Sequence, residues 1–421
     1  MKTPLQLDES VFQEIAEEFV APLFTGANVE VGPNDIPPRR YVQASTDFSR
    51  IEFRPCVEAG YSCVLVRDHP FTSSDVDVIK AFIMGLKRLR SVWNKSFLPE
   101  MLRASMRGVV AQAVTDPETP KEFKDTIADI LMHFEAWSEQ TYEGRRISSV
   151  IGVEPSSTAS ERIAVQSVMK RDFGAVLSVG PDAFVTVGAN GMLKSFSIPS
   201  SNLASTTSFA PLKFSRIAEW TGTKRVGIGL NRNGEIFVFK RKALVFCRRR
   251  GKWHHFTHEA VIQRMSLGGA ILPDVCSAIY ESALDVSFTR SGGCLAVVSE
   301  DHYDGFMKAE RVAAKDLLKT GKGVKTECLR HLVHAPFQDI DRRLRANILA
   351  IDGSTIIDHK GNVLAIGAIV EVAPGSPSGG RLAAAKSLAA FGLGVKISSD
   401  GPIRVFSQPE LERVREIASV G

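Results

Sequence analysis

The residues best suited to chemistry lie between positions 347 and 406, where an acidic turn and a glycine-rich basic turn follow one another. Asp352, Gly353 and Ser354 come directly after the apolar run 348–351, which we interpret as a strand ending at Asp352. A carboxylate at a strand end can bind a divalent ion or help to deprotonate a hydroxyl group. Glycine lets a ligand approach the backbone, and serine offers a hydroxyl donor. Asp-Gly-Ser is also a common plain turn, so the triplet alone does not define a site.

The second turn consists of Ser378, Gly379, Gly380 and Arg381, directly before a predicted helix over residues 382–391. Free backbone N–H groups at the start of a helix bind anions, and a neighbouring arginine can hold a phosphate through two hydrogen bonds. The alternative interpretation is a flexible link, because residues 374–380 are all small or proline.

A predicted hairpin separates the two turns, which lie about 27 residues apart. This ordered set resembles the diadenylate cyclase family. That family carries an Asp-Gly-Ala motif, and then a Gly-Thr-Arg-His-Arg-Ala-Ala loop that enters a helix. Asp352 and Gly353 match the first motif, and Ser354 stands for its alanine. Gly379 and Arg381 match the glycine and the first arginine of the loop.

The match to the basic loop is incomplete. Gly380 stands for the threonine, and Leu382 and Ala383 stand where the family has histidine and a second arginine. The two alanines that follow are kept, and the family's acidic turn has become Ser-Asp-Gly at residues 399–401. The resemblance covers about residues 270–407, including a helix that leads into an apolar strand.

The resemblance implies an α/β domain with a mixed sheet flanked by helices, and an activity that joins two ATP molecules into a cyclic dinucleotide. In the family, the basic loop of one subunit holds ATP phosphates while the aspartate of another supplies the metal. Losing one arginine and one histidine removes charge compensation worth several kcal/mol at the transition state. We therefore expect a nucleotide sensor of a bacterial defence or signalling system, with a homodimer mate or an effector protein as its partner, rather than an enzyme.

Two other hypotheses stay open. An active cyclase would need Mg or Mn at Asp352 as the catalytic and metal-binding residue, with Lys386 or Lys396 supplying the missing charge. A nucleic-acid-binding module would use the basic stretch 240–258, in which seven Lys/Arg residues alternate with aromatic residues. A solvated hairpin face explains the same stretch.

Hydrophobic periodicity divides the chain into four regions. Residues 1–70 predict a small mixed α/β region, and residues 71–145 a helical region with helices starting near Ser73, Pro99 and Pro120. Residues 146–257 predict a strand-rich α/β domain with hairpins at Asn190-Gly191 and Asn233-Gly234. Within it, residues 160–256 could be a worn copy of the C-terminal domain, 258–421.

Composition limits the class of protein. Of the 421 residues, 44% are hydrophobic and 24% charged, with a net charge of +5, which fits a soluble globular protein and does not by itself imply nucleic acid. The six cysteines are scattered without a Cys-x-x-Cys pair. The sequence offers no apolar run long enough for a bilayer and no signal-peptide pattern at its start. These features together predict a cytoplasmic protein without a membrane partner.

Overall fold

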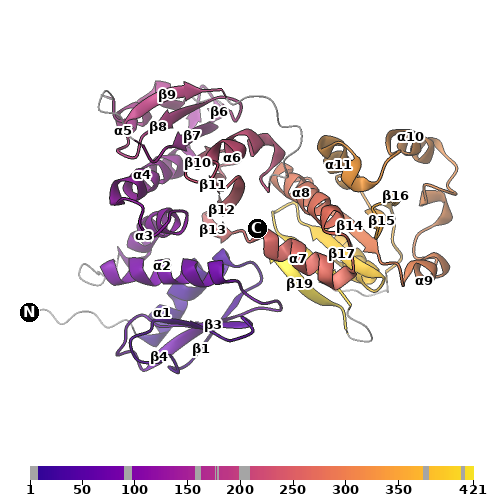
Figure 1. Ribbon diagram of the computed structural model, residues 1–421, viewed down its shortest axis with the longest axis horizontal. Helices are drawn as coiled ribbons and strands as arrows, with labels where there is room; N and C mark the ends of the chain where they lie inside the picture. Colours follow the sequence, from indigo (N-terminus) through magenta and orange to yellow (C-terminus); the bar gives the residue numbers. More distant parts are fainter. Residues whose placement is uncertain are drawn as a thin grey trace, which may run out of the picture. The chain divides into compact units, whose positions relative to one another are not determined.

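The computed structural model describes residues 8–89, 97–156, 163–175, 177, 180–198, 209–372, 379–408 and 413–421. The chain divides into two compact units, Met1–Phe256 and Thr257–Gly421 (Figure 1). Both are mixed α/β with mixed sheets flanked by helices, which confirms the expected fold class. No helix in the described part of the chain is long and apolar enough to cross a membrane.

The first unit begins with helix α1 (Glu9–Ile15), which Asp8 caps by accepting a hydrogen bond from the backbone N–H of Val11. The helix packs on a four-stranded antiparallel sheet with the order β1-β4-β3-β2. Its strands are β1 (Asn28–Pro33), β2 (Val42–Ala44), β3 (Arg50–Phe53) and β4 (Tyr61–Val66). Alternating buried residues on β3 and β4 face α1, as a sheet with one covered face requires.

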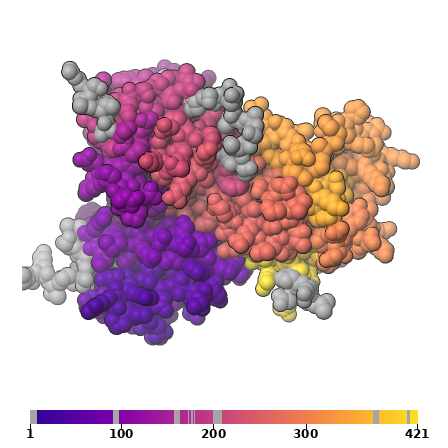
Figure 2. Space-filling view, in the orientation of Figure 1, coloured from indigo at the N-terminus to yellow at the C-terminus, as the bar shows by residue number. Residues whose placement is uncertain are grey.

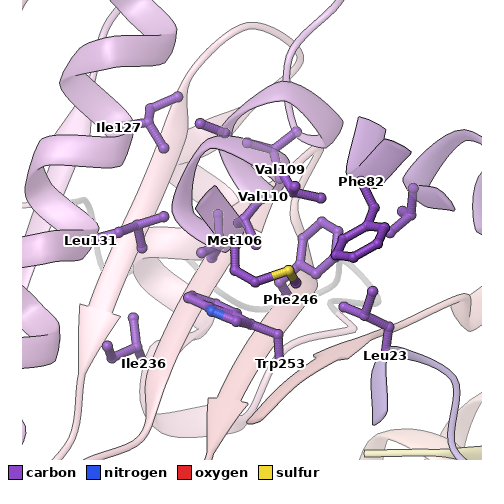
Figure 3. Packing of buried hydrophobic residues seen from close by; sticks show 14 of the residues in the cluster. Leu23, Phe82, Met106, Val109, Val110, Ile127, Leu131, Ile236, Phe246 and Trp253 are labelled. Atoms are coloured by element: carbon purple, nitrogen blue, oxygen red, sulfur yellow. The ribbon is translucent and has the colours of Figure 1, made fainter. Parts of the chain in front are cut away.

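Three helices follow, starting where the sequence predicted them: α2 (Ser73–Leu89), α3 (Leu98–Ala113) and α4 (Lys121–Trp137). Their apolar stripes bury Phe82, Met106 and Leu131 in a core shared with the second sheet of this unit (Figure 3). Phe246 and Trp253 close that core from the sheet. Two short strands, β5 (Thr141–Tyr142) and β6 (Arg145–Arg146), connect α4 to the sheet.

The second sheet has seven strands in the order β13-β12-β11-β10-β7-β8-β9. The strands are β7 (Ser149–Val153), β8 (Phe184–Val187), β9 (Leu193–Ser197), β10 (Val226–Leu230), β11 (Ile236–Lys240), β12 (Ala243–Arg249) and β13 (Lys252–His255). The short helix α5 (Val165–Met169) follows β7, and α6 (Ser215–Thr221) precedes β10 and packs on it. Gly191 and Gly234 adopt φ values of +74° and +75° at the predicted hairpin turns, which glycine tolerates.

The second unit is built on a six-stranded sheet with the order β16-β15-β14-β17-β18-β19 (Figure 1). The strands are β14 (Gly293–Val298), β15 (Ser354–Asp358), β16 (Val363–Ala368), β17 (Gly392–Ile397), β18 (Ile403–Ser407) and β19 (Arg415–Val420). The helices are α7 (His258–Gly269), α8 (Pro273–Thr289), α9 (Tyr303–Lys308), α10 (Val324–Leu332), α11 (Arg342–Leu349) and α12 (Gly380–Ala389). Helix α12 packs on β14 and β17.

The seven-stranded and six-stranded sheets share one topology. In each, the first strand (β7 or β14) is central and pairs in parallel with the second strand and antiparallel with the fourth. The third strand lies outside the second, and the fifth and sixth continue as an antiparallel meander from the fourth. A helix, α6 or α12, joins the third strand to the fourth. The matching arrangement starts at β7, ahead of residue 160, and the hypothesis that the two sheets are copies of one domain stays a prediction.

Two local predictions in the C-terminal unit are wrong. Residues 348–351 do not form a strand, because helix α11 runs to Leu349 and Asp352 lies in the turn that leads into β15. A short apolar run cannot be assigned from periodicity alone, and here the Asp341 cap fixes a helix. The sequence of residues 307–319 also predicts a helix, and this is wrong, since α9 ends at Lys308 and only a 3-10 turn, Ala314–Asp316, follows.

Candidate functional site

One helix start organises the candidate site. Helix α12 lies very close to the sheet, because a Cβ atom on Gly394 of β17 would overlap the carbonyl oxygen of Ala385. Ala384 and Ala385 are the small residues on the helix side of this contact, and both are buried. The close packing fixes the first turn of α12, with Arg381 as its second residue, over the end of the sheet where β14 begins.

Four polar side chains lie in one row across the strands at this end of the sheet. Strand pairing sets Cys294 opposite Ser354 on one side and opposite Lys396 on the other. Lys396 is in turn opposite Arg404. Side chains opposite one another share a face of the sheet, and Cys294 contacts α12 within its apolar cluster. The row therefore faces the helix that carries Arg381.

The guanidinium group of Arg381 lies against the start of β14. A Cβ atom on Gly292 would be 2.5 Å from Nη1 of Arg381 and 3.1 Å from the backbone nitrogen of Ser399. Gly292, with φ of +68°, thus leaves the space that the guanidinium occupies. Arg381 is also close enough to Cys294 and Lys396 to change the pKa of both.

The site has an excess of positive charge. Burial, together with the charges of Arg404 and Arg381, lowers the pKa of Lys396 from its ordinary value. Arg404 is compensated by Glu416, whose Oε2 lies 2.5 Å from Nη2 of the arginine. Among the residues that the structure describes, no carboxylate forms an ion pair with Arg381 or Lys396. The carboxylates of Asp400 and Glu416 partly oppose the shift of the Lys396 pKa, and Arg381 and Lys396 still leave room for an anionic ligand beside them.

The thiol of Cys294 is part of the same arrangement. Burial raises the pKa of this cysteine to about 11, although a hydrogen bond with Ser354 and the charge of Arg381 partly oppose the shift. The thiol is therefore protonated at neutral pH and has little nucleophilic character. Ser354, which the sequence assigned to the site, has its side chain buried here and bonded to Cys294.

The other predicted residues lie around this cluster. Asp352 is exposed in the turn before β15, and Gly353, with φ of +99°, packs tightly on the backbone of Gly367. Gly379 and Gly380 are exposed, with open space around both. Ser378 lies outside the described residues.

The predicted metal-binding residue, Asp352, belongs to no ready-made ligand cluster among the described residues. Within the described ranges, no three His, Cys, Asp or Glu side chains gather where they could hold a metal ion. Asp352 therefore stands as a single exposed carboxylate rather than as part of a metal-binding set.

The equivalent position of the first unit carries an ion pair at the surface. Asp182 lies two residues before β8, as Asp352 lies two residues before β15, and Arg216 is the second residue of α6, as Arg381 is of α12. Nη1 of Arg216 and Oδ1 of Asp182 are 3.1 Å apart and form an ion pair. The sequence analysis missed both residues, since only the shared topology identifies them.

Aromatic rings fill the face that is polar in the second unit. The first residue of β8 is Phe184, where β15 has Ser354, and its ring centroid is 5.1 Å from that of Trp220 on α6. The register sets Phe237 at the position of Arg404, and its ring lies 4.6 Å from that of Phe214. One copy thus carries a packed aromatic cluster where the other carries polar and cationic side chains.

The aromatic residues and two arginines of the basic stretch 240–258 are used inside the first unit, while Arg241, Lys242, Arg250 and Lys252 are exposed. Phe246 and Trp253 are core residues, and Nε of the buried Arg249 lies 2.7 Å from Oε1 of the buried Glu235. Nε of Arg248 lies 3.5 Å from Oε1 of Glu135. Each of these two arginines thus has a glutamate as its partner. The rings of Phe246 and Trp253 are buried and cannot stack on nucleic-acid bases. The stretch borders a cavity of about 370 Å³ that also contains the carboxylates of Glu18, Glu135 and Glu139.

Comparison with known proteins adds no assignment: no protein-family model matches the chain, and no curated protein sequence matches it.

Proposed function

We propose that the second unit binds the phosphate groups of a nucleotide, with an adenine nucleotide or a cyclic dinucleotide as the ligand class, and that the protein acts as a nucleotide sensor. Arg381 and Lys396 hold the phosphate, and the exposed start of α12 at Gly379 and Gly380 offers backbone N–H donors. Asp352 and Gly353 border the same end of the sheet. The resemblance of residues 270–407 to diadenylate cyclases supplies the nucleotide class.

The observation that carries this proposal is the contrast between the two copies of the sheet. The equivalent of Arg381 in the first unit is neutralised by a carboxylate at 3.1 Å, and aromatic rings fill the adjoining face. In the second unit, no carboxylate among the described residues forms a close ion pair with Arg381 or Lys396, although Asp400 and Glu416 raise the pKa of Lys396. Partly buried cations without a close ion pair lower the stability of the fold. Ligand binding accounts for their presence, and packing does not.

Lys396 can supply the positive charge that the basic loop lacks. Leu382 and Ala383 contribute no charge where the family has histidine and a second arginine. Lys396 reaches the same surroundings from β17, as the effect of Arg381 on its pKa indicates. Lys386, the other candidate, is exposed, and its Nζ lies 5.6 Å from the ring centroid of Phe406. We therefore assign the compensating charge to Lys396.

Mass spectrometry of nucleotides tests the proposal. The purified protein is incubated with ATP or cyclic di-AMP, with and without Mg²⁺ or Mn²⁺, and separated from free ligand before bound and free nucleotides are identified. We expect one unaltered nucleotide to remain bound. Retention should be reduced in the Arg381→Ala variant and unchanged in Arg343→Ala, an exposed arginine on α11.

Two results would overturn the sensor assignment. Metal-dependent appearance of a cyclic product from ATP, lost in Asp352→Asn, would make the protein a cyclase. Absence of any retained nucleotide would remove the nucleotide class itself.

A further inference from the structure

The four-stranded sheet of the first unit has an open edge beside a helix. Strand β2 is the last strand of this sheet, and α2 packs alongside it. A groove with a volume of about 560 Å³ runs between them. Both elements belong to the indigo and violet surface in the space-filling view (Figure 2).

The backbone of β2 presents hydrogen-bonding groups to this groove. The carbonyl of Tyr41 accepts from the N–H of Arg54 at 3.0 Å, and the N–H of Ser45 donates to the carbonyl of Arg50 at 3.0 Å. In an antiparallel pair, alternate residues bond to the neighbouring strand. Val42 and Ala44 lie at the intervening positions, so their N–H and C=O groups point away from β3 and toward the groove.

The groove combines an apolar floor with a positive rim. Val76 and Ile83 of α2 are buried beneath it, while Met84 is 50% exposed along its wall. Its two charged lining residues are Arg40 and Lys80, and Nζ of Lys80 lies 2.9 Å from Oδ1 of the exposed Asp77, which is not a lining residue. The Oε1 atom of Gln43, which also lines the groove, is buried without a hydrogen-bond partner among the described residues.

Edge strands are usually protected from pairing by proline, charged residues or bulges. The sequence of β2 is Val-Gln-Ala, with none of these, and the strand pairs with β3 without a register shift; its length of three residues is the protection it has. An uncharged open edge with an apolar groove and a helix beside it has the geometry by which extended peptides add a strand to a sheet.

We propose that β2 and α2 form a docking site for an extended acidic segment of a partner protein, which adds to the sheet next to β2. Main-chain bonds to Val42 and Ala44 supply affinity independent of sequence. Apolar side chains at alternate positions of the segment contact Met84 and the apolar floor. Acidic side chains at the remaining positions pair with Arg40 and Lys80. This inference does not depend on nucleotide binding by the second unit.

The probe for this site is a fluorescein-labelled decapeptide that alternates Glu with Val and Thr, titrated with the full-length protein in a fluorescence anisotropy experiment. A second peptide carries Lys in place of every Glu. We expect saturable binding of the Glu peptide, and binding of the Lys peptide that is about tenfold weaker or less, since the two rim charges would repel it.

Two variants locate the binding. Ala44→Pro removes an outward N–H group without removing a bond to β3, so the fold is kept while affinity falls about tenfold or more. Met84→Asp places a carboxylate in the groove and should weaken the Glu peptide similarly. The matched control is Met132→Asp on α4, where the native side chain is 41% exposed, and it should leave affinity unchanged.

Three outcomes would overturn the proposal. The first is a lack of saturable binding of the Glu peptide to the wild-type protein. The second is binding that neither Ala44→Pro nor Met84→Asp weakens. The third is a dimer in sedimentation velocity that Ala44→Pro converts to monomer, which would assign the edge to a second copy of this chain.

Discussion

Nη1 of Arg216 lies 3.1 Å from Oδ1 of Asp182, and this ion pair holds the positions that Arg381 and Asp352 hold in the other copy of the same sheet topology. In the second copy, the described residues include no carboxylate paired with Arg381. The same sheet topology thus carries an ion-paired arginine in the first unit and an arginine without an ion pair in the second. We propose that Arg381 lacks an ion-paired carboxylate because it binds a ligand.

The positive charge of Lys396 should lower the stability of the folded protein and strengthen nucleotide binding. Burial and two neighbouring arginines lower its pKa, which means that the protonated form is disfavoured in the folded state. Lys396→Met removes the charge and keeps the aliphatic chain. We expect the melting temperature to rise by about 2 °C, while nucleotide affinity falls about tenfold. Scanning calorimetry and a ligand titration of the same sample check both effects, and a variant that loses stability would contradict this account of the site.

The close contact between α12 and β17 should be intolerant of side chains. Gly394→Val places a branched side chain where the carbonyl oxygen of Ala385 lies, so α12 must move and carry Arg381 with it. We expect a loss of about 3 kcal/mol in the free energy of unfolding, as for other overpacked positions. Gly305→Ala on α9 is the matched control, because that glycine is helical and has open space around it. Urea denaturation of both variants tests the difference, and equal stabilities would be inconsistent with the contact.

A buried ion network should hold α11 to α8. Nε of Arg342 lies 2.7 Å from Oδ2 of Asp285, and Nη2 of Arg345 lies 3.0 Å from Oε2 of Glu281. Arg342→Ala leaves the buried Asp285 without this partner and should cost about 3–5 kcal/mol. Arg343→Ala, which removes an exposed side chain of the same helix, should change stability by less than about 0.5 kcal/mol. Chemical denaturation distinguishes the two, and similar losses would rule out the network as the cause.

Acid should weaken a second network, which lies in the first unit. Oδ1 of Asp75 lies 2.9 Å from Nδ1 of His255, and Oδ2 lies 3.0 Å from Nη2 of Arg67. Burial favours the neutral carboxyl, but the hydrogen bond and charge of His255 and the charge of Arg67 outweigh it and lower the pKa of Asp75 from 3.8 to about 2.

Because the pKa of Asp75 is lower in the folded state, its contribution is complete above pH 4 and is lost as the pH falls toward about 2. We expect the stability difference between wild type and Asp75→Asn to shrink by about 2–3 kcal/mol across this range. Denaturant titrations at a series of pH values measure that difference. A difference that stays constant with pH would exclude the ionised carboxylate as its source.

The sequence predicted those elements whose signals are local. Apolar periodicity located α2, α3 and α4, and the two Asn-Gly pairs located the turns of two hairpins, since two-residue turns restrict φ to values that glycine and asparagine tolerate. The prediction of a strand over residues 348–351 was wrong because these apolar residues also fit the buried face of a helix. The capping hydrogen bonds of Asp341 favour the helix over the strand.

The composition of the site depended on strand register. Asp352, Gly353 and Arg381 could be named from motifs, and Lys396 could be named as one of two candidate charges. Cys294 and Arg404 come from strands whose register relative to Lys396 no local pattern specifies. The basic stretch 240–258 shows the same limit, and its binding of nucleic acid stays a prediction. Its charges suggested a surface, whereas the long-range partners Glu135 and Glu235 use two of its arginines in ion pairs.

The most direct test of the account is an isothermal titration of wild type, Arg381→Ala and Arg343→Ala with ATP and with cyclic di-AMP. We predict saturable binding of at least one nucleotide to wild type, about tenfold or greater weakening in Arg381→Ala because a charge-assisted contact is lost, and wild-type affinity in Arg343→Ala. Equal affinity of wild type and Arg381→Ala would contradict the proposed site, and an absence of binding to wild type would contradict the nucleotide-sensor function.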